Sequence, residues 1–292
     1  MGGGSWTRDK FVSYSTSRGR ALREDGSTDI RGMSASQVYT QKNLDPMLNP
    51  LNVVRECCDS EEHPNTLPVI LALDVTGSMG QTAVEVSAEL NNIMTEIYKE
   101  VKDVEFMVMG IGDFVFDRAP LQVSQFESDI RIAEQLDKVW FEFGGGSNAW
   151  ESYSSAWAFA IKQTKLDCWK RGKKGIIITM GDEELNPSIP YEPYDRATGK
   201  ARELINAGAH DIDTKDLYKA VTELYEVYHI NVKHGGRNPD LSRFKEIIGE
   251  DHVFTVPVSG VAQVITTIVH DNAQKNDVTG SSGTGYDEGI SW

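Results

Sequence analysis

The chain has 292 residues, 39% of them hydrophobic, so it is long enough for one sizeable α/β domain with appendages or for two small domains. Its formal net charge of -15 disfavours nucleic acid and anionic membranes as partners, because both bind basic surfaces. No segment approaches the roughly 18 apolar residues of a membrane helix. The composition therefore predicts a soluble protein that binds neither nucleic acid nor membrane.

The three cysteines, Cys57, Cys58 and Cys168, match no known pairing or metal pattern. Two are adjacent and the third is distant, which gives neither a disulfide framework nor the C-x2-C spacing of a zinc site. This use of cysteine favours a reducing, cytoplasmic location.

Residues 1–66 are rich in Ser, Gly, Arg, Asp and Asn and show neither helical nor strand periodicity. They include the turn-prone stretch DPMLNPLN at 45–52. We expect an irregular N-terminal arm. At the other end, residues 276–292 are rich in Gly and Ser and are predicted to be a flexible tail.

From Leu67 the hydrophobic pattern alternates between strands and helices, which is typical of a parallel sheet flanked by helices. The predicted strands are 68–73, 104–112, 175–179, 227–233 and 252–256. The predicted helices are 81–100, 127–139, 151–164, 214–225, 241–248 and 261–273. The prolines of 181–195 argue against regular structure in that insertion. We therefore predict one doubly wound, mostly parallel, Rossmann-like α/β domain over 67–275, with helices on both faces.

Oxygen-bearing side chains occupy three loops of this predicted domain. They are Asp74, Thr76 and Ser78 after the first strand, Ser147 and Asn148 in the loop GGGSN, and Asp182, Glu183 and Glu184 after the strand GIIIT. The carboxyl ends of parallel strands meet at one edge of a sheet, where ligands bind. Mg2+ prefers oxygen ligands and usually keeps several waters. The three loops therefore predict a shallow divalent-cation site with an open coordination position.

The same stretches resemble von Willebrand factor type A (vWA) domains. DVTGSM resembles their D-x-S/T-x-S motif, GGGSN their second metal loop, and GIIIT followed by Gly-Asp the strand that supplies their last aspartate. The order and spacing of the motifs match over 67–275. By this resemblance, one Mg2+ or Mn2+ is held in a metal-ion-dependent adhesion site. Its ligands are Asp74, Thr76, Ser78, Ser147 and Asp182.

The resemblance also implies a function. vWA domains are generally adhesive or scaffolding modules rather than enzymes, and their metal leaves one position for an acidic residue of a partner protein. Trp150, Asn148 and Glu183 are predicted to form the rim that meets this partner. The chain is most similar to the intracellular, bacterial or phage-like members, which often work beside AAA-type ATPases, so the resemblance implies such an ATPase as partner.

One departure from the family concerns the third loop. The family usually has Asp directly after the Thr of the strand, whereas this chain reads Thr179, Met180, Gly181, Asp182. Either the loop is shifted so that Asp182 reaches the metal, or that ligand is missing and water substitutes.

Three alternatives remain open for these motifs. DVTGSM contains ordinary helix N-cap residues, so Asp74 could be part of a simple strand-to-helix turn. A metal-dependent hydrolase would use the same cation with His234 or Glu183 as base. A degenerate vWA scaffold would bind partners through the N-terminal arm and the 183–195 insertion. No residue is assigned a catalytic role.

Other polar and aromatic side chains are predicted to have structural roles. Asp113 and Asp117 are expected in a turn, His229 in the core, and His63 in solvent. The tryptophans expected to be packing anchors are Trp140, Trp157 and Trp169.

Overall fold

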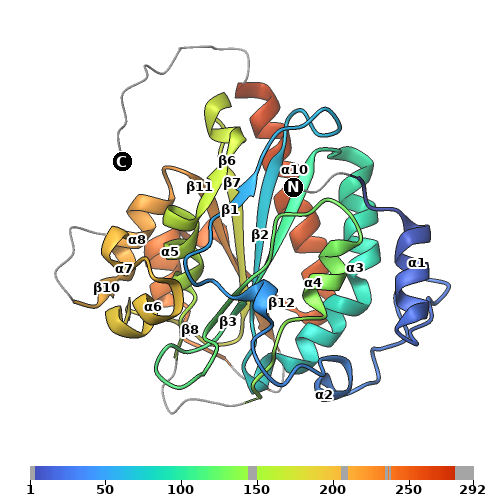
Figure 1. Ribbon diagram of the computed structural model, residues 1–292, viewed down its shortest axis with the longest axis horizontal. Coiled ribbons are helices and arrows are strands. Elements are labelled where there is room, and N and C mark those ends of the chain that lie inside the picture. The colour runs from blue at the N-terminus through green and yellow to red at the C-terminus, as the bar shows by residue number, and fades with distance from the viewer. Residues whose placement is uncertain (1–3, 144–149, 205–209, 234–235, 237, 280–292) are drawn as a thin grey trace.

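A six-stranded sheet forms the centre of the molecule (Figure 1). The structure is a computed structural model that describes residues 4–143, 150–204, 210–233, 236 and 238–279, without the side chains of residues 78 and 276–279. The strands are β2 (Leu67–Asp74), β3 (Val104–Ile111), β4 (Leu121–Val123), β7 (Gly175–Gly181), β11 (Tyr225–Lys233) and β12 (Val253–Pro257). All neighbouring strands are parallel except β3 and β4. The predicted doubly wound, mostly parallel α/β fold is confirmed.

The strand order is β12-β11-β7-β2-β3-β4. From β2 the chain first builds outward through β3 and β4, then returns to the other side of β2 and continues through β7, β11 and β12. The direction of growth therefore reverses between β2 and β7. In open α/β sheets, ligands bind at this switch point, beyond the carboxyl ends of the strands.

Helices cover both faces of the sheet (Figure 1). The first face packs against α3 (Gly80–Glu100), α4 (Arg131–Leu136) and α10 (Val261–Thr279). The second face packs against α5 (Ser154–Gln163), α8 (Thr214–Val221) and α9 (Ser242–Ile248). Alternate residues of β2 serve the two layers, because Leu71 lies in the first apolar cluster and Ile70 in the second. None of the helices within the described ranges is long and apolar enough to cross a membrane.

The edge of the sheet differs from the sequence prediction. The buried segment Leu121–Val123 pairs with β3 as the antiparallel strand β4, although the sequence predicted a loop. The helix predicted over 127–139 is reduced to α4, because Glu127 continues the edge of the sheet through two backbone hydrogen bonds with Phe106. β4 has only three residues, and a strand of this length is too short to show the alternation of apolar and polar side chains by which a strand is predicted.

The insertion after β7 is more regular than its prolines predicted, so the prediction of irregular structure is wrong there. It contains β8 (Glu184–Leu185), β9 (Ser188–Ile189), α6 (Tyr191–Thr198), α7 (Ala201–Leu204) and β10 (Ile212–Asp213). Pro190 is the N-cap of α6 and Pro193 lies in its first turn, where a missing N–H costs no helical hydrogen bond. Gly199 ends α6 with a φ of 71°.

The N-terminal residues also contain regular structure that the sequence did not predict. They form α1 (Arg8–Ser17), α2 (Ala35–Val38) and β1 (Arg55–Cys57), which pairs in parallel with β6 (Thr164–Leu166). Trp6, Phe11 and Ile30 are buried in the apolar cluster of α3. The Tyr39 hydroxyl lies 2.8 Å from the Ala83 carbonyl oxygen of α3. The arm therefore packs along the helical layer rather than extending from it.

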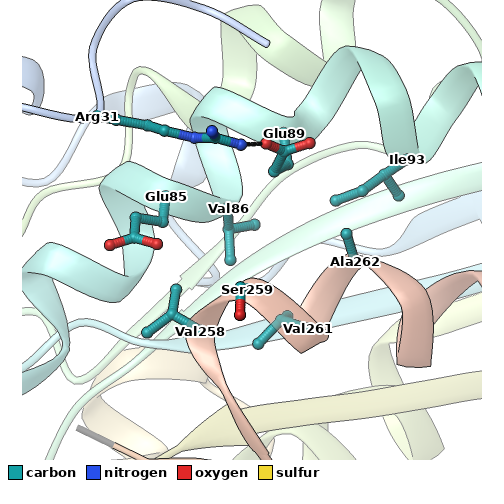
Figure 2. A pocket seen from close by; sticks show the side chains of 9 residues that line it. All are labelled: Arg31, Glu85, Val86, Glu89, Ile93, Val258, Ser259, Val261 and Ala262. Carbon is teal, nitrogen blue, oxygen red and sulfur yellow. Dashed lines mark ion pairs between the residues drawn. The ribbon is translucent and has the colours of Figure 1, made fainter. Parts of the chain in front are cut away.

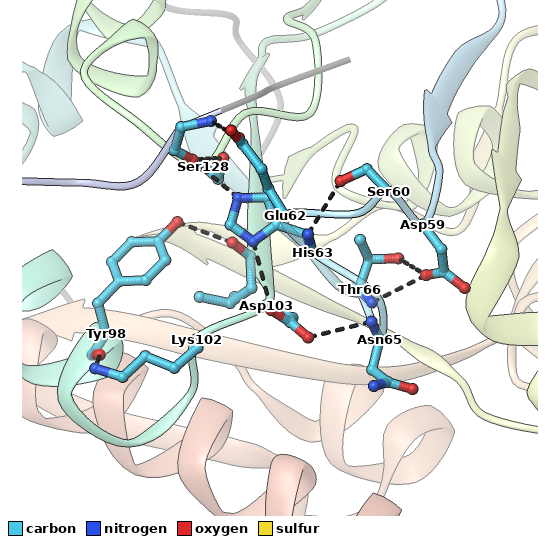
Figure 3. Close-up of polar contacts among 12 residues, drawn as sticks. Asp59, Ser60, Glu62, His63, Asn65, Thr66, Tyr98, Lys102, Asp103 and Ser128 are labelled. Carbon is cyan, nitrogen blue, oxygen red and sulfur yellow. Dashed lines mark hydrogen bonds and ion pairs between the residues drawn. The ribbon is translucent and has the colours of Figure 1, made fainter.

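His63 forms a hydrogen bond with the start of the N-terminal arm (Figure 3). Its Nε2 lies 2.9 Å from the Gly4 carbonyl oxygen, to which it must donate, and its Nδ1 lies 3.4 Å from Asp103 Oδ1. Ser128 Oγ donates to the same carbonyl, and the Gly4 N–H donates to Glu62. His63 is only 3% exposed, so the prediction that it is solvated is wrong. The reason is that the loop before β2 folds back onto the arm.

A groove of about 320 Å3 lies between α3 and the beginning of α10 (Figure 2). Val86, Ile93 and Val261 contribute apolar surface, and Arg31 of the arm forms an ion pair with Glu89 beside it. The groove contains none of the predicted site residues. The candidate site lies instead at the carboxyl ends of β2 and β7.

Candidate metal centre

Asp74 is the last residue of β2 and is completely buried. Its Oδ1 accepts hydrogen bonds from the Thr76 backbone N–H at 2.8 Å and from Thr76 Oγ1 at 2.6 Å. These bonds form a local Asx-type turn. The N-cap of α3 is Met79, with no side-chain capping bond. Asp74 therefore shapes the turn between β2 and α3 without capping α3 itself, and this geometry is compatible with both a metal loop and a simple strand-to-helix turn.

Tyr153 connects the first and third predicted metal loops. Its hydroxyl donates to Asp74 Oδ2 at 2.9 Å and accepts a longer hydrogen bond of 3.4 Å from the Glu183 backbone N–H. A Cβ at Gly181 would lie 1.8 Å from this hydroxyl, so glycine is required there for space. No periodic or motif signal in the sequence predicts a role for Tyr153 at this site.

The aspartate of the third loop comes two residues later than in the vWA motif. β7 continues through Met180 and Gly181, and Met180 pairs with Leu73 of β2. The Met180 side chain is buried in the apolar cluster beneath α3, so this position cannot present an oxygen ligand. Asp182 follows the strand, is 1% exposed, and raises the pKa of Asp74 through its charge. The structure thus brings Asp74 and Asp182 to the same edge.

Glu151 is a second residue that the sequence did not identify. It belongs to β5 (Trp150–Glu151), which pairs in parallel with β8 just beyond Asp182. Glu151 is 5% exposed, and its Oε2 has no hydrogen-bond partner among the described residues. A buried carboxylate oxygen without a partner is costly.

Asp74 and Glu151 favour their protonated forms. Burial raises the pKa of Asp74 to about 7, opposed by the hydrogen bonds from Thr76 and reinforced by the charge of Asp182. Burial also raises the pKa of Glu151 to about 10, with further contributions from neighbouring aspartates, Asp74 first. Neither Asp74 nor Glu151 forms an ion pair with any basic side chain in the described ranges. In their ionised forms, these two carboxylates therefore have no compensating basic side chain among the described residues.

Several predicted site residues cannot be placed. Ser147 and Asn148 lie in 144–149, outside the described residues, as does His234, and the side chain of Ser78 is not described. Of the predicted rim, Trp150 and Glu183 are half-buried.

The residues with predicted structural roles mostly have them. Asp113 and Asp117 form the expected turn, in which Asp117 Oδ2 accepts from the Asp113 backbone N–H at 2.7 Å. His229 is fully buried and its Nδ1 lies 2.9 Å from Thr179 Oγ1, although its Nε2 lacks a partner. Burial lowers the pKa of His229 to about 3, so it is neutral. Trp140 and Trp157 are buried as predicted, and Trp169 is half-buried.

The donor set at this edge fits a hard divalent cation. Asp74, Asp182 and Glu151 supply carboxylates, and the unpartnered Glu151 Oε2 lies among acidic groups that a positive charge would stabilise. Within the described part of the chain, however, no three His, Cys, Asp or Glu side chains are placed together as ligands of one metal ion.

Comparisons with known proteins found likeness only among solved structures. No protein-family model matches the sequence, and the search of curated proteins returned no match. The pilus adhesin SpaC from Lactobacillus rhamnosus GG is 13% identical, with a TM-score of 0.44 over 72% of this chain and 30% of the adhesin. BatB from Bacteroides thetaiotaomicron is 13% identical, with a TM-score of 0.43 over 71% of this chain and 99% of BatB. The vWF domain of the pilus tip protein Mfa5 from Porphyromonas gingivalis is 12% identical, with a TM-score of 0.41 over 75% of this chain and 98% of that domain.

Proposed function

We propose that this chain is a vWA-like protein-binding module that uses one Mg2+ or Mn2+ to bind a carboxylate of a partner protein. One observation carries the proposal: two buried aspartates, Asp74 and Asp182, meet at the carboxyl ends of the adjacent strands β2 and β7. This is the switch point of the doubly wound sheet, where the fold places ligands. The vWA-like motifs at the same positions support the proposal.

Each described residue has a distinct role in this proposal. Asp74 and Asp182 supply negative charge for the ion, and Thr76 fixes the orientation of Asp74 through its two hydrogen bonds. Tyr153 holds the other oxygen of Asp74 and keeps the first and third loops together. A bound divalent cation would supply the positive charge and the open coordination position. In a chain of net charge -15, such an ion allows an acidic side chain to bind.

Calorimetric titration of the metal-free protein with Mg2+ and Mn2+ tests the cation site. We expect saturable binding to one site, lost in Asp74→Asn and strongly weakened in Asp182→Asn. Asp251→Asn, at an exposed aspartate, is the matched control and should bind like the unmodified protein. No binding by the unmodified protein would contradict the proposal, and loss in Asp74→Asn alone would leave the third loop without a ligand.

Peptide display on the Mg2+-loaded protein tests the class of partner. We expect selected peptides to share an acidic residue, to be released by EDTA, and to bind Asp74→Asn poorly. Peptides that stay bound in EDTA would instead support the degenerate scaffold that binds through the N-terminal residues and the 183–195 insertion. Removal of residues 1–66 is not a clean test of that alternative, because Trp6 and Phe11 are part of the core.

The predictions about catalysis, cellular location and the identity of the partner have no support beyond the sequence. The hydrolase alternative stays a prediction from the sequence: of its two candidate bases, His234 lies outside the described residues and Glu183 is half-buried. A cytoplasmic location and an AAA-type ATPase partner remain predictions from the sequence.

A further inference from the structure

Glu151 is fixed at the meeting point of the loops by its backbone. β5 pairs with β8, which places Glu151 opposite Leu185, three residues after Asp182. The Glu151 carbonyl oxygen accepts hydrogen bonds from the Tyr153 N–H at 2.8 Å and from the Asn186 N–H at 3.3 Å. The position of this carboxylate is therefore set by the same short sheet that connects the region before α5 to the third loop.

Within the described part of the chain, no hydrogen bond to Glu151 Oε2 explains the burial of this side chain. The residue is only 5% exposed. The other buried glutamates have a partner: Glu127 Oε2 also lacks a hydrogen bond but lies 3.0 Å from the Arg131 guanidinium, and Glu105 bonds to the Cys57 thiol near His63. Glu151 instead interacts electrostatically with Asp74, Asp113, Asp117 and Asp182, all of them acidic. An unpaired carboxylate oxygen in an acidic surrounding is suited to a cation or its waters.

From this arrangement we infer that Glu151 is part of the cation site and accepts a hydrogen bond from a water bound to the ion. The inference rests on the proposed function and adds a residue outside the three vWA-like motifs. Because no three described acidic, His or Cys side chains are placed as direct ligands of one metal, the inference assigns Glu151 a contact with a bound water and not with the ion itself. Groups that contact a metal ion through its ligands or bound waters typically change the affinity of the protein for that metal by about 10- to 100-fold.

Titration of three variants with Mg2+ tests this role. Glu151→Gln keeps the size of the side chain and removes its charge, and we expect the dissociation constant to rise about 10-fold or more. Glu105→Gln makes the same change at a buried glutamate near the opposite end of the sheet and should leave Mg2+ affinity unchanged. Glu151→Asp keeps the charge on a shorter side chain and should bind Mg2+ with intermediate affinity. Thermal unfolding without metal establishes that each variant is folded.

The outcomes separate this inference from the proposed function. If the unmodified protein binds Mg2+ and Glu151→Gln binds it equally well, Glu151 has no role and the inference is overturned while the cation site stands. If the unmodified protein does not bind Mg2+, the proposed function fails and the inference with it. Should Glu151→Gln not fold, unchanged Mg2+ affinity in Glu151→Asp would overturn the inference in its place.

Discussion

Buried acidic side chains occur at both ends of the sheet, but the protein compensates for them differently. At the amino end, Glu127 and Asp129 are paired with Arg131, and Asp103 faces His63 (Figure 3). At the carboxyl end, Asp74 receives hydrogen bonds from Thr76 and Tyr153 and forms no ion pair with a described basic side chain. The proposed cation site would account for this difference, because a bound cation would supply the positive charge that faces Asp74.

The largest expected effect is on the pH dependence of stability, to which the buried carboxylates at the carboxyl end of the sheet should contribute most. Burial raises the folded-state pKa of Asp74 to about 7, from an unfolded value of 3.8. Proton binding by Asp74 therefore stabilises the folded state fully below about pH 4, and this contribution is lost as the pH rises through 7. Glu151, with its pKa raised to about 10, extends the loss to higher pH. Each unit of pKa shift corresponds to about 1.4 kcal/mol.

We therefore expect the metal-free protein to become less stable between pH 5 and pH 8, and Asp74→Asn to flatten this slope. Urea unfolding in EDTA at several pH values measures it. A stability that rises over this range would contradict uncompensated carboxylates at the carboxyl end.

Saturating Mg2+ should stabilise the protein by binding at the carboxyl end of the sheet and nowhere else. A ligand present at 100 times its dissociation constant contributes about 2.7 kcal/mol to the free energy of unfolding. We expect this gain in the unmodified protein and in Glu105→Gln, and none in Asp74→Asn. Urea unfolding at pH 7.5 with and without Mg2+ makes the comparison, and equal gains in all three proteins would place the ion elsewhere.

Gly181→Ala should break the connection between the loops. The new Cβ would overlap the Tyr153 hydroxyl, and overpacking of this kind costs about 1–3 kcal/mol. Gly32→Ala is the control, because nothing lies within 4 Å of the Cβ it would add. Unfolding free energies of the two variants give the result; similar values would mean that Tyr153 moves aside without cost.

Tyr153→Phe should have a smaller effect. It removes one hydrogen bond to Asp74, which corresponds to about 1 kcal/mol in the metal-free protein. Tyr194→Phe is the control, because Tyr194 is also fully buried, its hydroxyl has no hydrogen-bond partner of normal geometry among the described residues, and it does not contact Asp74. If denaturation shows equal losses, the hydrogen bond to Asp74 is not what distinguishes Tyr153.

His63→Gln should produce the smallest change in the free energy of unfolding, and it should disturb only the amino end of the sheet. Glutamine can still donate to the Gly4 carbonyl but loses the interaction with Asp103, so we expect a loss below about 1 kcal/mol. Mg2+ affinity should not change. A weaker Mg2+ affinity, measured by calorimetry, would show that the two ends of the sheet are coupled.

The central sheet was predictable because its strands are long and apolar. β2, β3, β7 and β11 lie within a few residues of their predicted positions, and their carboxyl ends identified Asp74 and Asp182 as neighbours. Elements of two or three residues, such as β4 and β5, are too short for a hydrophobic period and were missed.

The rest of the candidate site depends on contacts between distant segments. Tyr153 reaches Asp74 across 79 positions of sequence, and Glu151 joins the site only because β5 pairs with β8. His63 is buried for a similar reason, since Gly4 lies 59 positions away. Local patterns in a single sequence do not reveal contacts between residues that are this far apart along the chain.

A crystal structure with Mn2+, located by its anomalous scattering, tests the central claim most directly. The account predicts one peak at the carboxyl end of the sheet between Asp74 and Asp182, with Glu151 within reach of a bound water. A well-ordered structure at high Mn2+ concentration with no peak there, or with the only peak at the amino end, would contradict it.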